Sequence, residues 1–314
     1  MATSISVIVV SFRRGDELVF CLEDLAAQSA VKSFEVVLVL QQYPAGAADA
    51  LRKRFGSQLD LRIVEFPHGL GMPRARNEGL DVARGDIVAF LDDDVRLPAH
   101  WAASMSALYT NPEVGAVGGY VDHPQQYTPV RKALYRVLGI TSDRYRIDWG
   151  GFNRGPSTHR ADEQPADWLT GCNMSFRRSA IENVGRFDEG LGSFWHEDVD
   201  ATHRVAKAGW QVISSGRMAV KHYPSTVNRP PLHKQMRERE RLRVLFVWKV
   251  IGDRPLWKVR YAARLVLQAA AMAVIGARKG DPRIAFGVLR GGWEGYRGLD
   301  AARAADSMEK GTIR

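Results

Sequence analysis

Three consecutive carboxylates follow an uninterrupted apolar run in this chain. The run Ile87-Val88-Ala89-Phe90-Leu91 carries no polar side chain, and Asp92, Asp93 and Asp94 follow it at once. Such a run is typical of a strand buried on both faces, and ligands bind at the carboxyl ends of strands in open α/β sheets. Carboxylates this close repel one another unless a cation neutralises them, and oxygen ligands suit Mg²⁺ or Mn²⁺. The acids therefore predict a divalent-cation site, with a polar turn that merely ends a strand as the alternative.

The elements that would position these acids alternate between strands and helices. Strands are predicted over residues 5–11, 34–40, 61–66 and 87–91, and helices over 18–28, 49–55 and from Pro73 onward. This alternation indicates a mostly parallel α/β sheet with right-handed crossovers. Later elements are predicted as strands over 114–121, 211–214 and 218–221, as helices around Ile181 and over 198–208, and as a further segment of unassigned type over 168–176. Residues 122–166, rich in Pro, Gly and Tyr, indicate an active-site loop.

Composition indicates a folded protein of a reducing compartment. The chain has 314 residues, enough for one large domain with an appendage. Its two cysteines, Cys21 and Cys172, argue against a disulfide scaffold. The apolar run Ile5 to Val10 is too short for a signal peptide, and no window is expected to reach the roughly 20 apolar residues of a membrane span. We therefore expect a cytoplasmic protein.

The positive charge is concentrated beyond the predicted sheet. The net charge is +9, and the segment from Arg229 to Arg264 alone holds eleven Lys/Arg against three Asp/Glu. After Pro230-Pro231 the pattern changes to long amphipathic helices, so we place a boundary between a domain over 1–228 and a helical segment over 229–314. A basic amphipathic helix with Trp and Leu on its other side lies readily on an anionic membrane. Residues 229–280 are thus a candidate attachment surface at the inner face of the cell membrane, with packing on the first domain and homodimerisation as alternatives.

Five short motifs occur in one order between residues 4 and 224. They are Val7 to Phe12 followed by Leu18, Leu22, Leu25 and Gln28; Gly71 to Gly79; Phe90 to Asp94; Gly171 to Arg177; and Glu197-Asp198-Val199-Asp200 with Arg204. In order and spacing these motifs resemble the inverting glycosyltransferases of family 2, which have the GT-A fold and use nucleotide-diphosphate sugars. The resemblance implies an α/β protein with a Rossmann-like, mostly parallel sheet flanked by helices, and with the helical segment as a C-terminal appendage.

The resemblance also implies a metal site and a base. Asp92 and Asp94 match the family's DxD-type motif, whose acids contact ribose and coordinate Mn²⁺ or Mg²⁺, and His222 is a candidate third ligand. Asp198 matches the base that takes the proton from the acceptor hydroxyl, while Glu197 matches a residue that positions the acceptor or a loop. The alternatives are a packed histidine at a strand end and acids that only cap the helix over 198–208.

The donor is expected to bind at the ends of the first strands. A small polar group and a ring there could contact a base and ribose, and the start of a helix attracts phosphate. The expected donor-binding residues are Ser11, Phe12, Arg14, Gln41, Gly71, Arg76, Asp92, Asp93, Gly171 and Asn173. Relatives usually carry an acid after the second strand that hydrogen-bonds uracil, whereas Gln41 and Gln42 stand here. The donor nucleotide is therefore left open among UDP, dTDP and GDP.

The acceptor is expected to be a glycan or lipid-linked hydroxyl. Trp195 and His196 are candidate acceptor contacts because aromatic faces stack on sugar C–H surfaces, although tryptophan is more often a core residue. Nucleotidyl transfer to a sugar phosphate is an alternative, but it would need a glycine- and lysine-rich phosphate loop where Phe12-Arg13-Arg14-Gly15-Asp16 stands. A basic nucleic-acid-binding protein is disfavoured, since acids at the sheet edge would repel phosphates. We expect no nucleic-acid partner.

Overall fold

The computed structural model describes residues 4–28, 34–123, 141–148, 152–156, 158–191, 195–225, 230–252 and 256–312, the last twelve and residue 251 by their backbone alone. The chain divides into two compact units. The first holds Met1–Arg146, Asn153–Ser193 and Glu197–Val227, and the second holds Ile147–Phe152, Phe194–His196 and Asn228–Arg314. Much of the expected active-site loop over 122–166 lies outside the described residues.

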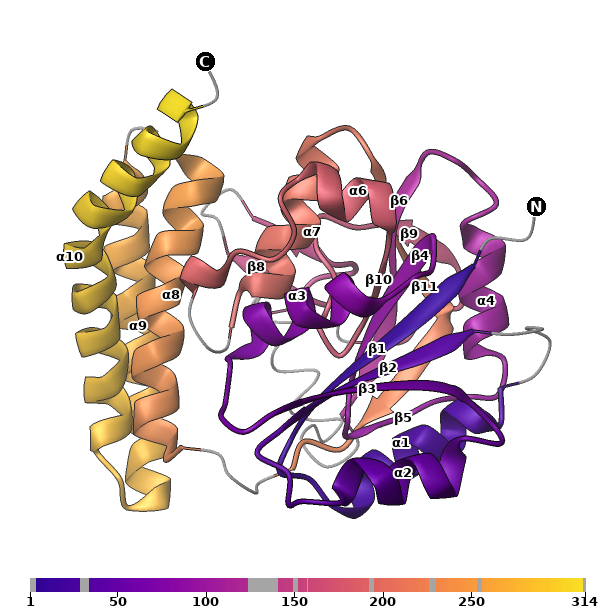
Figure 1. Cartoon of the computed structure of the whole chain (residues 1–314). Coiled ribbons are helices and arrows are strands. Elements are labelled where there is room, and N and C mark those ends of the chain that lie inside the picture. The colour runs from indigo at the N-terminus through magenta and orange to yellow at the C-terminus, as the bar shows by residue number, and fades with distance from the viewer. Residues whose placement is uncertain are drawn as a thin grey trace. The chain divides into compact units, whose positions relative to one another are not determined.

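The first unit is built on one sheet of nine strands (Figure 1). Four parallel strands make one half, in the order β3-β2-β1-β4: β1 (Ile5–Phe12), β2 (Glu35–Gln41), β3 (Asp60–Phe66) and β4 (Ile87–Asp92). The other half continues as β10-β6-β11-β5 with β9 beside β11, and its strands are β5 (Val95–Arg96), β6 (Val114–Asp122), β9 (Glu163–Pro165), β10 (Asn173–Arg177) and β11 (Gln211–His222). Two short strands, β7 (Arg146–Ile147) and β8 (Asn153–Arg154), make a separate sheet.

The order of the parallel strands reverses at β1, which lies between β2 and β4. Val10 of β1 is level with Asp92 of β4, so Ser11 and the three acids emerge at the same edge. Crevices that bind ligands form outside the carboxyl ends of strands where the strand order reverses. The topology therefore places the acidic motif at the expected ligand edge.

Helices cover both faces of this sheet (Figure 1). The helices are α1 (Asp16–Ala26), α2 (Ala47–Phe55), α3 (Met72–Val82), α4 (Trp101–Leu108), α6 (Arg178–Asn183) and α7 (Glu197–Lys207), with a 3-10 turn at Glu189–Leu191. Val7 and Val9 of β1 belong to the same core cluster as Leu18 and Leu22 of α1. Ile8 points to the other face, where Gly79 of α3 lies so close that a Cβ there would come within 2.5 Å of it. Burial on both faces explains why the strand sequences are unbroken apolar runs.

The strands predicted near the end of the first unit differ from the structure. The strands expected over 211–214 and 218–221 are one strand, β11, whose register against β6 shifts between Ser215 and Val220. In the segment 168–176 the structure has the start of β10, which begins at Asn173. The polar residues Ser214, Ser215 and Gly216 interrupt the apolar pattern of β11 without ending the strand, because its ladder to β6 resumes after the irregularity.

The second unit consists mainly of three helices that run side by side (Figure 1). They are α8 (Leu232–Ile251), α9 (Trp257–Lys279) and α10 (Arg283–Thr312). Three glycines at four-residue spacing on α10 lie against backbone carbonyls of α8, and a Cβ on the middle one, Gly291, would fall 2.0 Å from the oxygen of Arg237. Glycine therefore permits backbone-to-backbone packing here.

The expectation that no segment is long enough to cross a membrane is corrected by α9. This helix has 23 residues, a mean hydropathy of 1.3 over its most apolar window, and only 17% of that window buried. The sequence expectation counted only the uncharged residues from Leu265 onward, because Arg264 ends that stretch on its N-terminal side. The mean hydropathy of a longer window of α9 stays high although the helix contains Arg264 and Gln268. By length and composition alone, α9 could span a membrane.

Candidate active site

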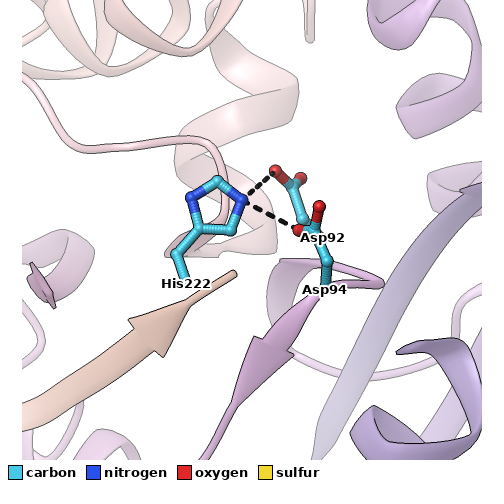
Figure 2. Close-up of side chains that lie close together, drawn as sticks. All are labelled: Asp92, Asp94 and His222. Atoms are coloured by element: carbon cyan, nitrogen blue, oxygen red, sulfur yellow. Dashed lines mark ion pairs between the residues drawn. The ribbon is translucent and has the colours of Figure 1, made fainter. Parts of the chain in front are cut away.

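Asp92, Asp94 and His222 come together at the carboxyl edge of the sheet (Figure 2). Asp92 ends β4, and the chain then turns through Asp94 into β5. Since β5 pairs with the end of β11, His222 is level with Val95, one residue after Asp94. The Nε2 atom of His222 lies 2.8 Å from Oδ1 of Asp94 and 4.0 Å from Oδ2 of Asp92. The pairing of β5 with β11 thus places His222 next to Asp92 and Asp94.

These three side chains fit a divalent cation. One potential ligand atom from each lies within 4.8 Å of the others. Burial and then the neighbouring Asp94 raise the pKa of Asp92. The pKa of Asp94 is lowered, because the hydrogen bond and charge of His222, the Ser225 N–H and Arg14 together outweigh burial. Two carboxylates and one imidazole are a donor set that Mn²⁺ accepts, and carboxylates also suit Mg²⁺.

Asp93 belongs to a different set of contacts. Its Oδ2 accepts a 2.5 Å hydrogen bond from the Ser11 hydroxyl, and its Oδ1 lies 3.3 Å from Nε of Arg14. Arg14 also approaches Asp94, at 3.8 Å. Burial raises the pKa of Asp93 to about 7, with the Asp94 charge adding to the effect and Ser11 and Arg14 opposing it. Ser11, Asp93 and Arg14 therefore tie the ends of β1 and β4 together.

Tyr43 joins this set, and the sequence analysis did not identify it. Its hydroxyl lies 2.6 Å from Oγ of Ser11 and accepts a hydrogen bond from the Arg14 backbone N–H at 3.1 Å. Its position directly after Gln41 and Gln42, at the end of β2, is the feature of the sequence that could have identified it. A second unidentified neighbour is His123, which follows β6 and whose ring centre lies 5.1 Å from that of His222.

The expected base-recognition residues lie around the loop that precedes α3. The side-chain carbonyl of Gln41 accepts a 2.7 Å hydrogen bond from the Leu70 backbone N–H. Phe12 packs on the same loop, since a Cβ at Gly69 would come within 3.2 Å of its ring. Gly71 precedes α3 with a φ of 82°, a conformation that L side chains rarely adopt. Gln41, Phe12 and Gly71 thus shape one loop at the sheet edge.

Arg76 of α3 connects the metal-ligand candidates with the second pair of acids. It is buried, and its NH1 lies 2.8 Å from Oε1 of Glu197. Its NH2 lies 3.8 Å from Oδ1 of Asp92 and donates to the carbonyl of Gly171 at 3.2 Å. Its guanidinium also sits over the ring of Phe187, 5.4 Å from the ring centre. One buried cation therefore faces carboxylates from two separate motifs.

Asp198 and Glu197 begin α7 beside this arginine. Asp198 accepts hydrogen bonds from the backbone N–H groups of Gly171 at 2.7 Å and of Val199 at 2.8 Å. Burial raises the pKa of Asp198, with Arg76 and these N–H groups opposing the shift. Burial also raises the pKa of Glu197 to about 7, with Arg76 opposing it and Asp198 adding to it. Carboxylates with raised pKa values are suited to accept a proton near neutral pH.

Gly171 should not tolerate a side chain. A Cβ there would lie 2.6 Å from NH2 of Arg76 and 3.1 Å from Oδ2 of Asp198. Gly171→Ala is therefore expected to push Arg76 and Asp198 apart and to lower turnover about 10²-fold, the typical cost of a small misplacement. Gly298→Ala is the matched control, since nothing lies within 4 Å of the added atom. Steady-state kinetics and circular dichroism of both variants test this. Unchanged turnover by Gly171→Ala would contradict the placement.

Three predicted site residues have other contacts. Asn173 begins β10, the strand between β4 and β6, and its buried side chain accepts from Nε1 of Trp101 at 2.9 Å and donates to the carbonyl of Met218 at 2.6 Å. Trp195 and His196 belong to the second unit. There Arg239 lies over the Trp195 ring, and the buried His196 ring stacks on Phe246 at 5.4 Å. The acceptor-binding roles of Trp195 and His196 stay predictions.

Burial of His196 also argues against a charged imidazole. Burial, together with the positive charges of Arg243 and Arg239, lowers the pKa of His196 well below its usual range. Both Trp195 and His196 have a positive φ, 82° and 69°, which is uncommon for residues with side chains. The backbone immediately before Glu197 is therefore strained.

Comparisons with known proteins match the part of the chain that holds Arg76, the three acids after β4 and Gly171. A family model described as glycosyl transferase family 2 matches residues 6–185. A pre-mycofactocin glycosyltransferase of Mycobacterium tuberculosis is 32% identical over 155 residues, which cover 49% of this chain and 30% of the relative. An N-acetylglucosaminyl-diphospho-decaprenol L-rhamnosyltransferase of the same species is 32% identical over 156 residues, covering 48% of this chain and 46% of the relative. The chain thus spans less than half the length of either protein.

A solved structure shares the fold. The mannosyltransferase PcManGT of Pyrobaculum calidifontis, solved in complex with GDP-Man and Mn²⁺, superposes with a TM-score of 0.60. The match covers 94% of this chain and 88% of that one at 18% sequence identity. At this identity the likeness shows the fold alone, and that fold is the GT-A architecture with its mostly parallel sheet flanked by helices.

Proposed function

Because the chain belongs to glycosyl transferase family 2, whose model matches more than half of it, we propose that it transfers a sugar from a nucleotide-diphosphate donor to an acceptor hydroxyl, with a divalent cation and with inversion at the anomeric carbon. One observation carries this proposal. Arg76 joins the cation-binding candidates to the acid pair of α7, at 3.8 Å from Asp92 and 2.8 Å from Glu197. A cation site and a carboxylate base side by side are what displacement of a nucleoside diphosphate requires.

The residues divide the chemistry between them. Asp92, Asp94 and His222 would hold Mn²⁺ or Mg²⁺, which when bound neutralises charge on the departing diphosphate. Asp198 accepts the proton of the acceptor hydroxyl as its oxygen bonds to the anomeric carbon, while the bond from that carbon to the phosphate oxygen breaks on the opposite face. Hydrogen bonds from Gly171 and Val199 fix the orientation of the Asp198 carboxylate. Arg76 and Glu197 position Gly171 and the start of α7.

Names of similar proteins indicate the substrate class. The solved neighbour contains GDP-Man and Mn²⁺, and one relative is named for a diphospho-decaprenol substrate. We extend these to a nucleotide-sugar donor carrying UDP, dTDP or GDP and to a glycan or lipid-linked acceptor. The side-chain carbonyl of Gln41 accepts a hydrogen bond from the Leu70 N–H. Its side-chain N–H₂ group would therefore donate to an acceptor atom of the nucleotide base.

The experiment is a donor panel of UDP-, dTDP- and GDP-sugars with and without Mn²⁺, in which nucleoside diphosphate release is followed and the anomeric configuration of the product is read by NMR. The expected result is turnover of one donor only with the cation, with inversion. Retention at the anomeric carbon would overturn the single-displacement scheme. Release of pyrophosphate from a nucleoside triphosphate would instead indicate nucleotidyl transfer.

Turnover should fall as the pH is lowered. A base acts only when deprotonated, so the raised pKa of Asp198 moves the acidic limb of the rate profile above the ordinary value of 3.8. Arg76 opposes this rise, so Arg76→Gln should move the limb to still higher pH and Arg76→Lys should restore it in part. The measurement is kcat at saturating donor and Mn²⁺ between about pH 5 and pH 9. If Arg76→Gln left the acidic limb of the pH–rate profile unchanged, the result would contradict the assignment of Asp198 as the base.

A further inference from the structure

The solvent-facing side of α9 is apolar. Over residues 262–277, all of which the structure describes, every fully exposed position carries alanine, valine or leucine. The largest of these side chains are Val266, Leu267 and Val274, with 62%, 67% and 57% of their surface exposed. A helix that packs on a soluble core normally turns its apolar side inward. This helix turns much of its apolar surface outward.

The polar side chains of the same stretch point inward instead. Gln268 donates to the buried Glu240 of α8 at 2.5 Å and accepts from Arg243 at 2.7 Å. Arg264 lies over the ring of Phe152, 5.0 Å from its centre. Since these two are the polar residues between 262 and 277, this stretch of α9 turns its polar side chains toward the rest of the unit. The outward face of α9 is left to aliphatic side chains.

A neighbouring stripe on α10 adds aromatic and basic side chains. Phe286, Leu289, Trp293 and Tyr296 are exposed and recur every three or four residues along one side of α10. Arg283, Arg290 and Arg297 are exposed beside them at seven-residue spacing, with Arg283 paired to Asp281 at 2.7 Å and Arg290 to Glu294 at 2.9 Å. Lys258 of α9 donates to the Tyr296 hydroxyl at 3.2 Å, so the two faces adjoin. Residues 256–300 hold eight Lys/Arg against three Asp/Glu.

We propose that this α9–α10 face, the exposed apolar residues of 259–274 and 286–296 with their flanking cations, binds the surface of an anionic lipid bilayer. Aliphatic side chains enter the acyl region, Trp293 and Tyr296 lie at headgroup level, and the arginines contact lipid phosphates. The charge-free stretch 265–277 is about 20 Å long at about 1.5 Å per residue, although the whole 23-residue helix is long enough for a roughly 30 Å hydrocarbon core. Because Gln268 is bonded to Glu240 and Arg243 of α8, we place one face of α9 along the interface and not the whole helix across the bilayer.

A second copy of the chain fits this face less well. A symmetric dimer brings the same patch against itself, which would bring together two copies of a segment, residues 256–300, that carries eight Lys/Arg against three Asp/Glu. Like charges brought together at an interface disfavour association. An anionic bilayer supplies the opposite charge. The proposal goes beyond the transfer reaction, because it rests on the second unit alone.

Flotation of the full chain with vesicles tests the proposal. Binding is expected to phosphatidylcholine vesicles that contain phosphatidylglycerol, and to weaken on pure phosphatidylcholine and in high salt, where the Debye length falls from about 10 Å to about 3 Å. Leu267→Glu should reduce binding about tenfold or more. Phe20→Glu, at an exposed aromatic residue of α1, is the matched control and should bind normally. Equal flotation of all three proteins would overturn the proposal.

A fluorescent label on the same face tests membrane binding without introducing a charged side chain. Cys21 and Cys172 are buried, so a nitrobenzoxadiazole dye on Val266→Cys reports this face, and one on Ala50→Cys of α2 serves as control. The fluorescence emission of the dye is expected to shift to the blue when anionic vesicles are added to the labelled Val266→Cys variant, and not with the labelled Ala50→Cys variant. A blue shift without vesicles, with doubled mass in light scattering, would show a second copy on the face and overturn the proposal. Soluble donor turnover, unchanged by Leu267→Glu, keeps this test separate from that of the transfer reaction.

Discussion

Asp198→Asn is expected to lower the turnover number by about 10²–10⁴-fold, the usual contribution of a general base, while donor affinity changes little. The amide keeps the shape of the carboxylate, and its oxygen still accepts the N–H of Gly171 or Val199. It cannot accept the proton of an acceptor hydroxyl. The loss should therefore appear in kcat and not in donor affinity, as is typical when an interaction made only in the transition state is removed.

Asp81→Asn is the matched control for this substitution. Asp81 lies on α3 and forms an exposed ion pair with Arg186 at 2.5 Å, and exposed pairs contribute about 0–1 kcal/mol. Single-turnover kinetics and donor titration of both variants should separate chemistry from binding. If Asp198→Asn turned over at the rate of the parent, the base would have to be another group, with Glu197 next to be tested.

Asp94→Asn is expected to weaken Mn²⁺-dependent donor binding by more than about 10²-fold, since even partners outside the first ligand set cost 10–100-fold in metal affinity. Asp94 faces His222 at 2.8 Å, receives the Ser225 N–H at 3.1 Å, and has a lowered pKa. It is therefore charged and oriented at neutral pH. An amide removes the negative charge that a divalent cation needs.

Asp86→Asn is the control at the opposite end of the same strand. Asp86 directly precedes β4, and its carboxylate accepts two hydrogen bonds from Ser4, at 3.1 and 2.8 Å. Its substitution should leave Mn²⁺ and donor affinity unchanged, although stability can fall slightly. Isothermal titration of Mn²⁺ with a fixed nucleotide makes the comparison. Equal affinity in Asp94→Asn and the parent would remove Asp94 from the ligand set.

Local patterns predicted much of the catalytic unit. The buried strands β1, β2 and β4 have unbroken apolar sequences because both of their faces are covered, and the acids follow β4 directly. The position of His222 was also readable as a strand end. The family resemblance made it a candidate ligand beside Asp92 and Asp94, but the local pattern alone could not bring it there, because its approach to Asp94 depends on the pairing of β5 with β11, which joins segments more than 120 residues apart.

Other features depend on three-dimensional contacts that no sequence pattern contains. Arg76 was predicted to bind phosphate from its place at a helix start, yet the structure pairs it with Glu197, 121 residues further along the chain. Asn173 lies in a family motif, but its side-chain amide is hydrogen-bonded to Trp101 and Met218. For α9 the composition showed an amphipathic helix. Which side faces inward followed only from the contacts of Gln268 with α8.

The most direct test of the central claim is calorimetric titration of the intact chain with UDP-, dTDP- and GDP-sugars, each in the presence of Mn²⁺ and of a chelator. The account predicts that one nucleotide sugar binds with Mn²⁺ and that this binding is lost with the chelator and in Asp94→Asn. Equal affinity with and without the cation, or no binding of any nucleotide sugar with Mn²⁺ present, would contradict a metal-assisted glycosyl transfer at Asp92, Asp94 and His222.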